Sequence, residues 1–178
     1  MFPIYIESER FFLRTLTVDD ATNTYQSWLR DPETNKYILS ATDSTANNLS
    51  ILAKYISEKN NNDNVIFLGI FTRNNSRHIG NIKFEPIERK NSIAIMGILI
   101  GESSWRGKGL AQEILNVTSN WLYSNIGITK IGLRVDHQNS AAIRAYLKAG
   151  FIIENWGIYR VEDKDAIPMV RCIEVRNS

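Results

Sequence analysis

The sequence predicts a single domain over residues 1–178, of the α/β or α+β class, in which helices cover the faces of a mixed sheet. Its 178 residues are enough to bury a core without disulfides. Segments with apolar residues at helical spacing alternate with short, strand-like apolar runs. Their order is one strand, two helices, three strands, a helix, a strand, a helix and two strands. This order gives about seven strands and about four helices.

The N-terminal third is predicted to hold one strand and two helices. Residues 8–16 (SERFFLRTL) place aromatic and branched side chains between polar ones, as a strand does. Thr17 and Asp20 resemble a capping box, after which apolar residues recur at helical spacing until Asp31-Pro32 ends the helix. A second amphipathic pattern predicts a helix at about residues 45–58.

A three-stranded antiparallel meander is predicted in the middle of the chain. Its strands are apolar runs at residues 65–71, 78–84 and 93–100, with polar turns between them. A glycine-containing turn follows, and an apolar stripe then predicts a helix at about residues 109–125.

The C-terminal part is predicted to add a strand, a short helix and two further strands. Asn139 or Ser140 can cap the helix, because both accept N-terminal bonds, and Gly150 can end it in a left-handed conformation. The strands are at residues 131–135, 151–159 and 166–175, with a polar turn at residues 162–165.

The composition excludes several classes of function. The net charge of +2, without a basic block, does not predict nucleic acid as a partner. The only cysteine, Cys172, cannot form an internal disulfide, and its strand-like surroundings predict a buried structural thiol. The N-terminal segment has acids where a signal peptide has bases, and no apolar run approaches membrane-spanning length. We therefore expect a cytoplasmic protein with no membrane association.

The turn before the helix at 109–125, residues 103–113 (SSWRGKGLAQE), predicts an anion site. Gly107 and Gly109 leave the backbone uncluttered where a strand gives way to a helix. Unpaired N–H groups and the positive end of the helix dipole then point at one place, which favours a phosphate.

Two common phosphate-binding motifs fit this turn poorly. A Walker loop has four residues between its first glycine and its Gly-Lys pair, but here five residues separate Gly101 from Gly107. The Gly-Lys pair of a Walker loop is followed by Ser or Thr, but here Gly109 follows Lys108. A dinucleotide fingerprint requires a third glycine where Gln112 stands, and it opens a βαβ unit instead of following a meander.

The third interpretation is the pattern Arg106-x-x-Gly109-x-Ala111, which resembles the acetyl-CoA loop of the GCN5-related N-acetyltransferases, the GNAT family. Residues 94–113 as a whole resemble the RimJ/RimL-type branch of this family. Residues 139–151 (NSAAIRAYLKAGF) resemble the family's second cofactor motif, at the usual separation from the first. The similarity extends from about residue 6 to residue 175, so the chain is identified as a member of the family.

The resemblance implies a GNAT fold, whose mostly antiparallel sheet is splayed at the cofactor site, and acetyl-CoA as the cosubstrate. The strand at Leu99, Ile100 and Gly101 would pair with the pantetheine arm, splayed from the strand at 131–135. A backbone N–H there would polarise the thioester carbonyl. The pyrophosphate would be held by the backbone of Arg106, Gly107, Lys108, Gly109, Leu110 and Ala111. The side chains of Arg106 and Lys108 would either add charge near the phosphates or be merely solvated.

Two residues of the second motif have a structural alternative. Asn139 matches the family residue that bonds the pantetheine region, and it is equally a helix cap. Tyr146 matches the family's candidate general acid, because a phenol can protonate a departing thiolate; alternatively it binds the cofactor and only positions its sulfur. By spacing alone, Tyr146 would be an inward-facing core residue.

The general base is not identified. The branch commonly has a glutamate at the position of Ile95, and isoleucine cannot accept a proton. None of the polar groups near predicted strand ends is singled out by its spacing; these are Glu85, Glu88, Glu102, Asp136 and His137. His78 is expected to be a surface or hairpin residue. The two histidines and one cysteine are well separated and offer no metal ligand set.

The resemblance implies an acyltransferase that moves acetyl from acetyl-CoA to a primary amine by direct attack in a ternary complex. The acceptor is either a protein N-terminal amine, as the RimJ/RimL likeness suggests, or a small amine. Its site would be built from the first two helices, the loop at residues 40–44 and the final hairpin, with Tyr37, Trp156 and Tyr159 as candidate wall residues. A non-catalytic acyl-CoA-binding or regulatory module is the alternative, because of Ile95. The oligomeric state is left open, with a homodimer among the alternatives.

Overall fold

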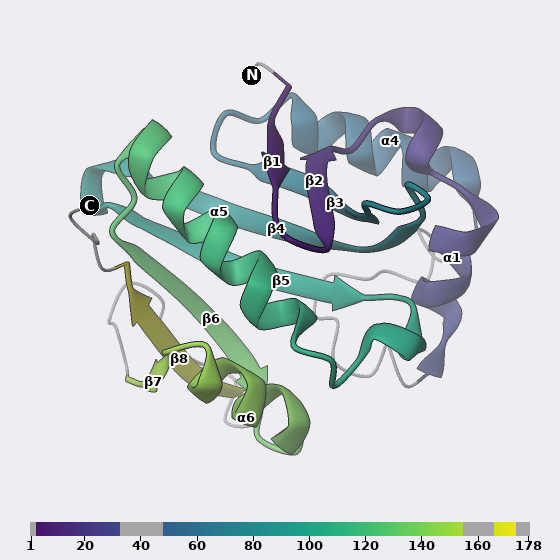
Figure 1. Cartoon of the computed structure of the whole chain (residues 1–178). Helices are drawn as coiled ribbons and strands as arrows, with labels where there is room; N and C mark the ends of the chain where they lie inside the picture. The colour runs from purple at the N-terminus through teal and green to yellow at the C-terminus, as the bar shows by residue number, and fades with distance from the viewer. Residues whose placement is uncertain (1–2, 33–47, 155–165, 174–178) are drawn as a thin grey trace.

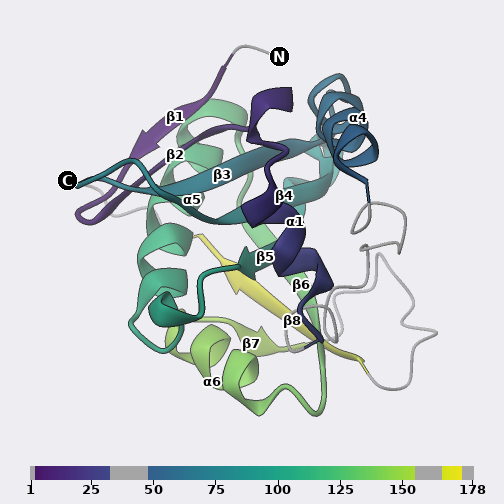
Figure 2. The same cartoon turned by 90° about the vertical axis from the view of Figure 1, so that its right-hand side faces the viewer.

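Eight strands form one sheet in the computed structural model, which describes residues 3–32, 48–154 and 166–173 (Figures 1 and 2). Their order across the sheet is β1-β2-β3-β4-β5-β6-β8-β7. Neighbouring strands are antiparallel except β5 and β6, which form a parallel pair. The strands are β1 (Tyr5–Glu7), β2 (Phe11–Thr15), β3 (Ile66–Thr72), β4 (His78–Glu88), β5 (Ile93–Ile100), β6 (Lys130–Asp136), β7 (Ile152–Ile153) and β8 (Ala166–Cys172).

Helices cover both faces of this sheet (Figures 1 and 2). On one face α5 (Leu110–Ile126) and α6 (Ser140–Lys148) close the larger core, which contains the fully buried Ile114 and Phe151. On the other face α1 (Asn23–Arg30) and α4 (Leu49–Asn60) close a smaller core that includes Trp28, Ile56 and Leu99. The predicted fold class is confirmed, with eight strands in place of about seven.

Capping residues explain where the helices begin. Asn139 accepts the Ala142 N–H at 3.1 Å and starts α6, which confirms the predicted cap. The capping box of Thr17 and Asp20 is also present, but it caps the 3-10 turn Val18–Asp20. The α-helix begins one turn later, where Thr22 accepts the Tyr25 N–H at 3.2 Å.

The N-terminal strand was predicted too long at its start. The prediction began at residue 8, but residues 8–10 form the turn between β1 and β2. Ser8 closes this turn, since its N–H donates to the Phe11 carbonyl oxygen at 2.8 Å and its Oγ accepts the Phe11 N–H at 3.2 Å. The short strand β1 was missed because it has only three residues.

Three other predictions extend beyond the described residues; one of them, the strand at 166–175, is observed as β8. The helix predicted at 45–58 is observed as α4, which Asn48 caps at its N-terminus. The strand predicted at 151–159 is observed only as β7, an edge strand of two residues. The turn at 162–165, the loop at 40–44 and the wall residues Tyr37, Trp156 and Tyr159 lie outside the described ranges.

The β5–β6 pair is interrupted, and this opening positions the candidate site. The parallel register covers only Ile93↔Lys130, Ala94↔Ile131 and Ile95↔Gly132. Beyond it, β5 stays paired with β4 as far as Ile100, and β6 stays paired with β8 as far as Asp136. The two strands therefore splay toward their C-terminal ends, as the resemblance implied (Figure 1).

A tight contact fixes α1 against the end of β5. A side chain at Gly101 would place its Cβ 2.0 Å from Trp28 Cδ2, so only glycine fits beneath the indole. At Gly97, in the middle of β5, the same atom would meet nothing within 4 Å.

We predict that Gly101→Ala destabilises the protein by about 1–3 kcal/mol, because the rigid indole and α1 must move to admit one methyl group. The matched control, Gly97→Ala, should change the unfolding free energy by less than about 0.5 kcal/mol. Urea denaturation of both variants checks this. Equal stability of the two variants would contradict the packing assigned to Trp28.

Candidate active site

The turn between β5 and α5 has the backbone geometry of an anion site. Gly107 and Gly109 have φ of +72° and +75°, in the left-handed region that glycine tolerates best. Gly109 is the N-cap of α5 and provides no side-chain bond. The first amide bonded at this helix end is that of Glu113, which donates to the Gly109 carbonyl oxygen at 3.1 Å. The preceding amides therefore have no intrahelical acceptor, and with the helix dipole they favour an anion.

The charged side chains of the turn are held close to it. Arg106 Nε donates to the Ile100 carbonyl oxygen at 3.2 Å, and Nη2 lies 3.8 Å from a carboxylate oxygen of Asp31. Lys108 Nζ lies 5.8 Å from the centroid of the Trp105 ring. Both cations thus add positive potential beside the uncapped helix end.

The residues predicted to meet the pantetheine arm differ in their surroundings. Leu99 is buried on the α1 face, and Ile100 is half-buried against the core beneath α5. Gly101 lies beyond the strand, where its N–H donates to the Ile79 carbonyl oxygen at 3.0 Å. Leu99 and Ile100 thus lie at the splay, whereas Gly101 is engaged by a neighbouring strand and by Trp28.

The two residues of the second motif lie on α6, on the same face of the sheet as α5 (Figure 1). Asn139 occupies the N-cap, and its Oδ1 is used by the Ala142 N–H. The ring centroid of Tyr146 lies 5.7 Å from that of Phe151, at the edge of the larger core. Burial raises the pKa of the Tyr146 phenol to about 12, so this group stays protonated at neutral pH.

The candidate bases are all engaged by other groups. Glu85 pairs with Lys59 and Lys83, and these bonds hold the pKa of its carboxyl below the usual value although burial opposes them. Glu102 pairs with Arg77 at 2.7 Å. Of the other candidates, Asp136 accepts the Gln138 N–H at 2.7 Å, Glu88 accepts from Asn91 at 3.0 Å, and His137 lies 3.9 Å from Asp136.

Ile95 occupies the fork of the splay. It is half-buried and belongs to the last β5–β6 pair, opposite Gly132. The position where the branch commonly has a glutamate is therefore an apolar one at the point where the two strands separate.

His78 was expected at the surface or in a hairpin, and only the second expectation is correct. It starts β4, but its ring is largely buried, with centroids 4.7 Å from Phe71 and 5.1 Å from Trp28. Nε2 lies 2.9 Å from the Gly80 carbonyl oxygen, to which a neutral imidazole donates. Burial lowers the pKa of His78 to about 4, so a neutral ring packs between α1 and the sheet.

A polar group from the N-terminus, which sequence reasoning missed, lies against the turn. Arg10 and Ser8, between β1 and β2, bond to Glu113 in the first turn of α5. More than 100 residues separate these partners along the chain, and no sequence pattern connects them.

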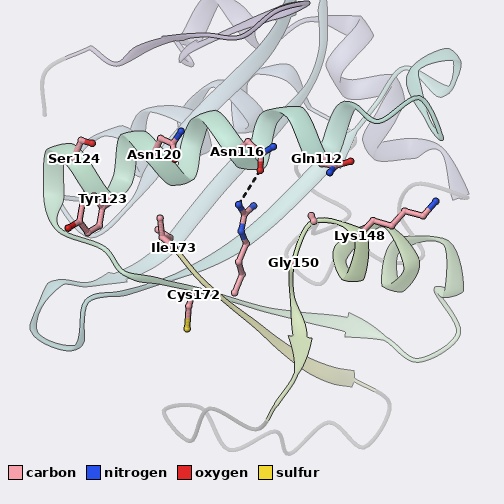
Figure 3. Close-up of a pocket in the computed structure, with 11 residues that line it drawn as sticks. Gln112, Asn116, Asn120, Tyr123, Ser124, Lys148, Gly150, Cys172 and Ile173 are labelled. Atoms are coloured by element: carbon pink, nitrogen blue, oxygen red, sulfur yellow. Dashed lines mark hydrogen bonds between the residues drawn. The ribbon is translucent and has the colours of Figure 1, made fainter. Parts of the chain in front are cut away.

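A second opening of about 670 Å³ lies between the side of α5, the end of α6 and β8 (Figure 3). Arg171 lines this opening and donates from Nη2 to Asn116 Oδ1 at 3.1 Å. Cys172, predicted to be a buried thiol, is exposed at its edge. The prediction was wrong because Cys172 is the last residue of β8, and its side chain alternates with that of Arg171, which turns toward α5.

Within the described ranges, no group of three or more His, Cys, Asp or Glu residues could hold a metal ion. Nor is any helix in this part of the chain both long enough and apolar enough to cross a membrane.

Comparisons with known proteins agree with this geometry. The model of the acetyltransferase (GNAT) domain matches residues 10–152. The uncharacterized N-acetyltransferase YoaA of Bacillus subtilis strain 168 is 30% identical over 151 residues, which cover 85% of this chain and 84% of YoaA.

Two solved structures share the fold at low sequence identity. The spermidine N-acetyltransferase of Vibrio cholerae, in complex with CoA and spermine, has a TM-score of 0.77 and 18% identity. The alignment covers 92% of this chain and 96% of that one. RimL, a ribosomal L7/L12 α-N-protein acetyltransferase in complex with coenzyme A, has a TM-score of 0.79 and 16% identity. Here 96% of this chain and 98% of RimL are covered.

The chain therefore belongs to the GNAT family of N-acetyltransferases, and its enzyme class is acyltransferase. RimL and the ribosomal-protein-S5-alanine acetyltransferase of Vibrio fischeri are among its structural relatives.

The buried His78 predicts a stability that depends on pH. Its pKa is about 4 in the folded protein and about 6.5 when unfolded, so between these values only the unfolded chain takes up the proton. The unfolding free energy should therefore fall as the pH falls from 6.5 toward 4, by at most about 1.4 kcal/mol per pH unit.

His78→Phe, which keeps an aromatic ring among its neighbours, should flatten this dependence above pH 4.5. His137→Gln, at the more exposed histidine, should leave it unchanged. Urea titrations at several pH values give the slopes. An equal slope in wild type and His78→Phe would rule out His78 as its source.

Proposed function

We propose that this protein transfers acetyl from acetyl-CoA to a primary amine by direct attack in a ternary complex. The observation that carries the proposal is the joint occurrence of the splayed β5–β6 strands and the uncapped, glycine-flanked start of α5 at the end of β5. The splayed strand edges suit a ligand that carries peptide-like amides, and the helix start suits a pyrophosphate at the end of that ligand. That is the chemistry of coenzyme A.

The residues that would hold the cosubstrate follow from this arrangement. Backbone N–H groups from Gly107 to Ala111 bind the pyrophosphate, and the side chains of Arg106 and Lys108 raise the local potential. The backbone N–H of Arg106, expected to join them, instead donates to the Ser103 carbonyl oxygen at 3.0 Å. Leu99 and Ile100 present strand edges to the pantetheine amides. A backbone N–H of the splayed strand polarises the thioester carbonyl and stabilises the oxyanion that forms when the amine attacks.

Tyr146 is the proposed proton donor to the departing thiolate. Its raised pKa keeps the phenol protonated at neutral pH, so an O–H is present to bond the sulfur, and the same shift makes the phenol a weaker acid than a free tyrosine. The attacking amine loses its proton to a group that we do not assign. Ile95 cannot accept it, and the nearby carboxylates are held in ion pairs or turns.

Two classes of acceptor are proposed. By their names, RimL is an α-N-protein acetyltransferase of ribosomal L7/L12, the V. fischeri enzyme acts on an alanine of ribosomal protein S5, and the V. cholerae enzyme acts on spermidine. A protein N-terminal amine and a small amine are therefore the two candidates. We also propose that residues 1–178 form one domain, and that the protein acts in the cytoplasm without metal, nucleic acid or membrane. A homodimer remains one candidate assembly.

Thiol release from acetyl-CoA in the presence of amine panels tests the function. One panel holds peptides with free N-termini, each matched by its N-terminally blocked form, and the other holds polyamines and amino sugars. We expect release to depend on both acetyl-CoA and one class of amine. A protein that does not bind CoA would overturn the proposal, whereas tight binding without turnover on any amine would favour a non-catalytic acyl-CoA-binding module.

A matched pair of glycine variants controls this assay. Gly109→Ala and Gly127→Ala both place a side chain at positive φ, +75° and +69°, at the two ends of α5. Both should lose about 1 kcal/mol of stability. Only Gly109→Ala should weaken CoA binding, because only that residue belongs to the turn.

Tyr146→Phe is predicted to lower kcat on the order of 100-fold, the usual range for loss of a general acid, while the Kd of CoA changes by less than about twofold. The ring remains, so packing against Phe151 is kept. Single-turnover kinetics and equilibrium binding separate the two effects. An unchanged kcat would remove Tyr146 from the chemistry and leave it as a core residue.

A further inference from the structure

We propose that Arg10, in the turn between β1 and β2, is a positioning residue for the coenzyme turn between β5 and α5. The inference rests on the proposed function and extends its site to the opposite end of the chain. The turn that would hold the anion is fixed at its two ends by its chain connections to β5 and α5. Arg10 holds it at a third point, through hydrogen bonds.

This third point of attachment is a pair of hydrogen bonds from the Arg10 guanidinium, called here the fork. Arg10 Nε donates to Glu113 Oε2 at 2.7 Å, and Nη1 donates to the carbonyl oxygen of Lys108 at 3.1 Å. Its Nη2 lies 3.9 Å from the place where a Cβ at Gly109 would be, so the guanidinium lies directly against the turn. A planar group with several fixed N–H directions can make these bonds together, and a lysine cannot.

Glu113 is the fixed point for this fork. Its Oε1 accepts the Ser8 hydroxyl and the Arg10 backbone N–H, both at 2.8 Å, so the carboxylate receives three bonds from one N-terminal turn. Burial alone would raise the pKa of Glu113, but these bonds and the Arg10 charge hold it below the usual value. The carboxylate therefore stays ionised and keeps its bonds at neutral pH.

The pairing also has an electrostatic consequence for an anionic ligand. Glu113 is the only acidic residue in the first turn of α5, directly behind the amides that would face the pyrophosphate. An unpaired carboxylate there would repel the ligand and offset the helix dipole. Arg10 cancels that charge at 2.7 Å and leaves the helix end attractive to anions.

The Arg10 side chain is itself held in place by an aromatic ring. Its guanidinium carbon lies 5.0 Å from the centroid of the Phe11 ring, and Phe11 meets Trp105 of the turn edge to face at 5.1 Å. Arg73 Nη1 donates to the Ser8 carbonyl oxygen at 3.0 Å from the outer side. Arg10 therefore joins a rigid hairpin turn to the coenzyme turn.

The test compares three probes that differ in what they present to the turn. CoA and dephospho-CoA carry the pyrophosphate, and pantetheine lacks it. For Arg10→Gln we expect the Kd of CoA and of dephospho-CoA to rise about tenfold, as for loss of charge-assisted hydrogen bonds. Inhibition by pantetheine should stay within about twofold of wild type, since the splayed strands are untouched.

Two further variants keep the result interpretable. Arg89→Gln removes a cation that bonds to Asn64 and to the Asp63 carbonyl oxygen, away from the coenzyme turn and the N-terminal hairpin, and it should leave CoA binding unchanged. Arg10→Lys keeps the charge but not the fork, so its Kd for CoA should fall between those of wild type and Arg10→Gln. The acetyl-CoA KM should rise in the Arg10 variants while kcat at saturation stays near wild type.

Three outcomes would overturn the inference. These are a wild-type Kd for CoA in both Arg10 variants, equal weakening of CoA and pantetheine, and equal weakening in Arg10→Gln and Arg89→Gln. Failure of wild type to bind CoA would instead remove the proposed function, so the two ideas fail separately.

Discussion

The parallel contact between β5 and β6 ends after three residue pairs, and the rest of the candidate site depends on this ending. A parallel pair needs a crossover connection, which here is α5, so the helix must start beyond the C-terminal end of β5. The strands then diverge because β4 and β8 continue to hold them from outside. The divergence leaves backbone groups facing a gap, and backbone polar groups require partners. A ligand that carries peptide-like amides can supply them.

The two faces of the splayed sheet differ in chemistry. The face beneath α5 and α6 joins an uncapped helix end to a half-buried phenol, which suits a donor with phosphates at one end and a thioester at the other. The face beneath α1 and α4 is closed by aromatic contacts among Trp28, His78 and Phe71, with the imidazole neutral. Where β5 and β6 separate, the Ile95 side chain is purely apolar. In the proposed mechanism, chemistry at this point would therefore depend on backbone groups more than on an ionised side chain.

Much of this could be predicted from the sequence, because the information is local. The turn around Gly107 and Gly109 and the cap at Asn139 are set by the conformational preferences of a few neighbouring residues, and the structure has both features. The strand boundaries of β5 and the sheet class follow from periodicity for the same reason.

The errors arose where the outcome depends on distant segments. His78 was expected in a hairpin or at the surface; the hairpin is correct, but the sequence did not reveal the aromatic rings from α1 and β3 that pack on its imidazole. Cys172 looked buried because a short apolar run does not reveal where a strand ends. The contact between Arg10 and Glu113 joins the two ends of a long sequence interval, and no local pattern in either segment indicates it. Only the folded sheet brings them together.

The hairpin of β1 and β2 is the edge of the sheet, and edges open more easily than central strands. Because it shares hydrogen bonds with the coenzyme turn, the two segments are thermodynamically linked. A ligand that orders the turn must protect the hairpin amides from exchange by the same free energy by which an intact hairpin favours the ligand. The first dozen residues, far from the family's sequence motifs, are in this sense a reporter of whether the coenzyme site is occupied.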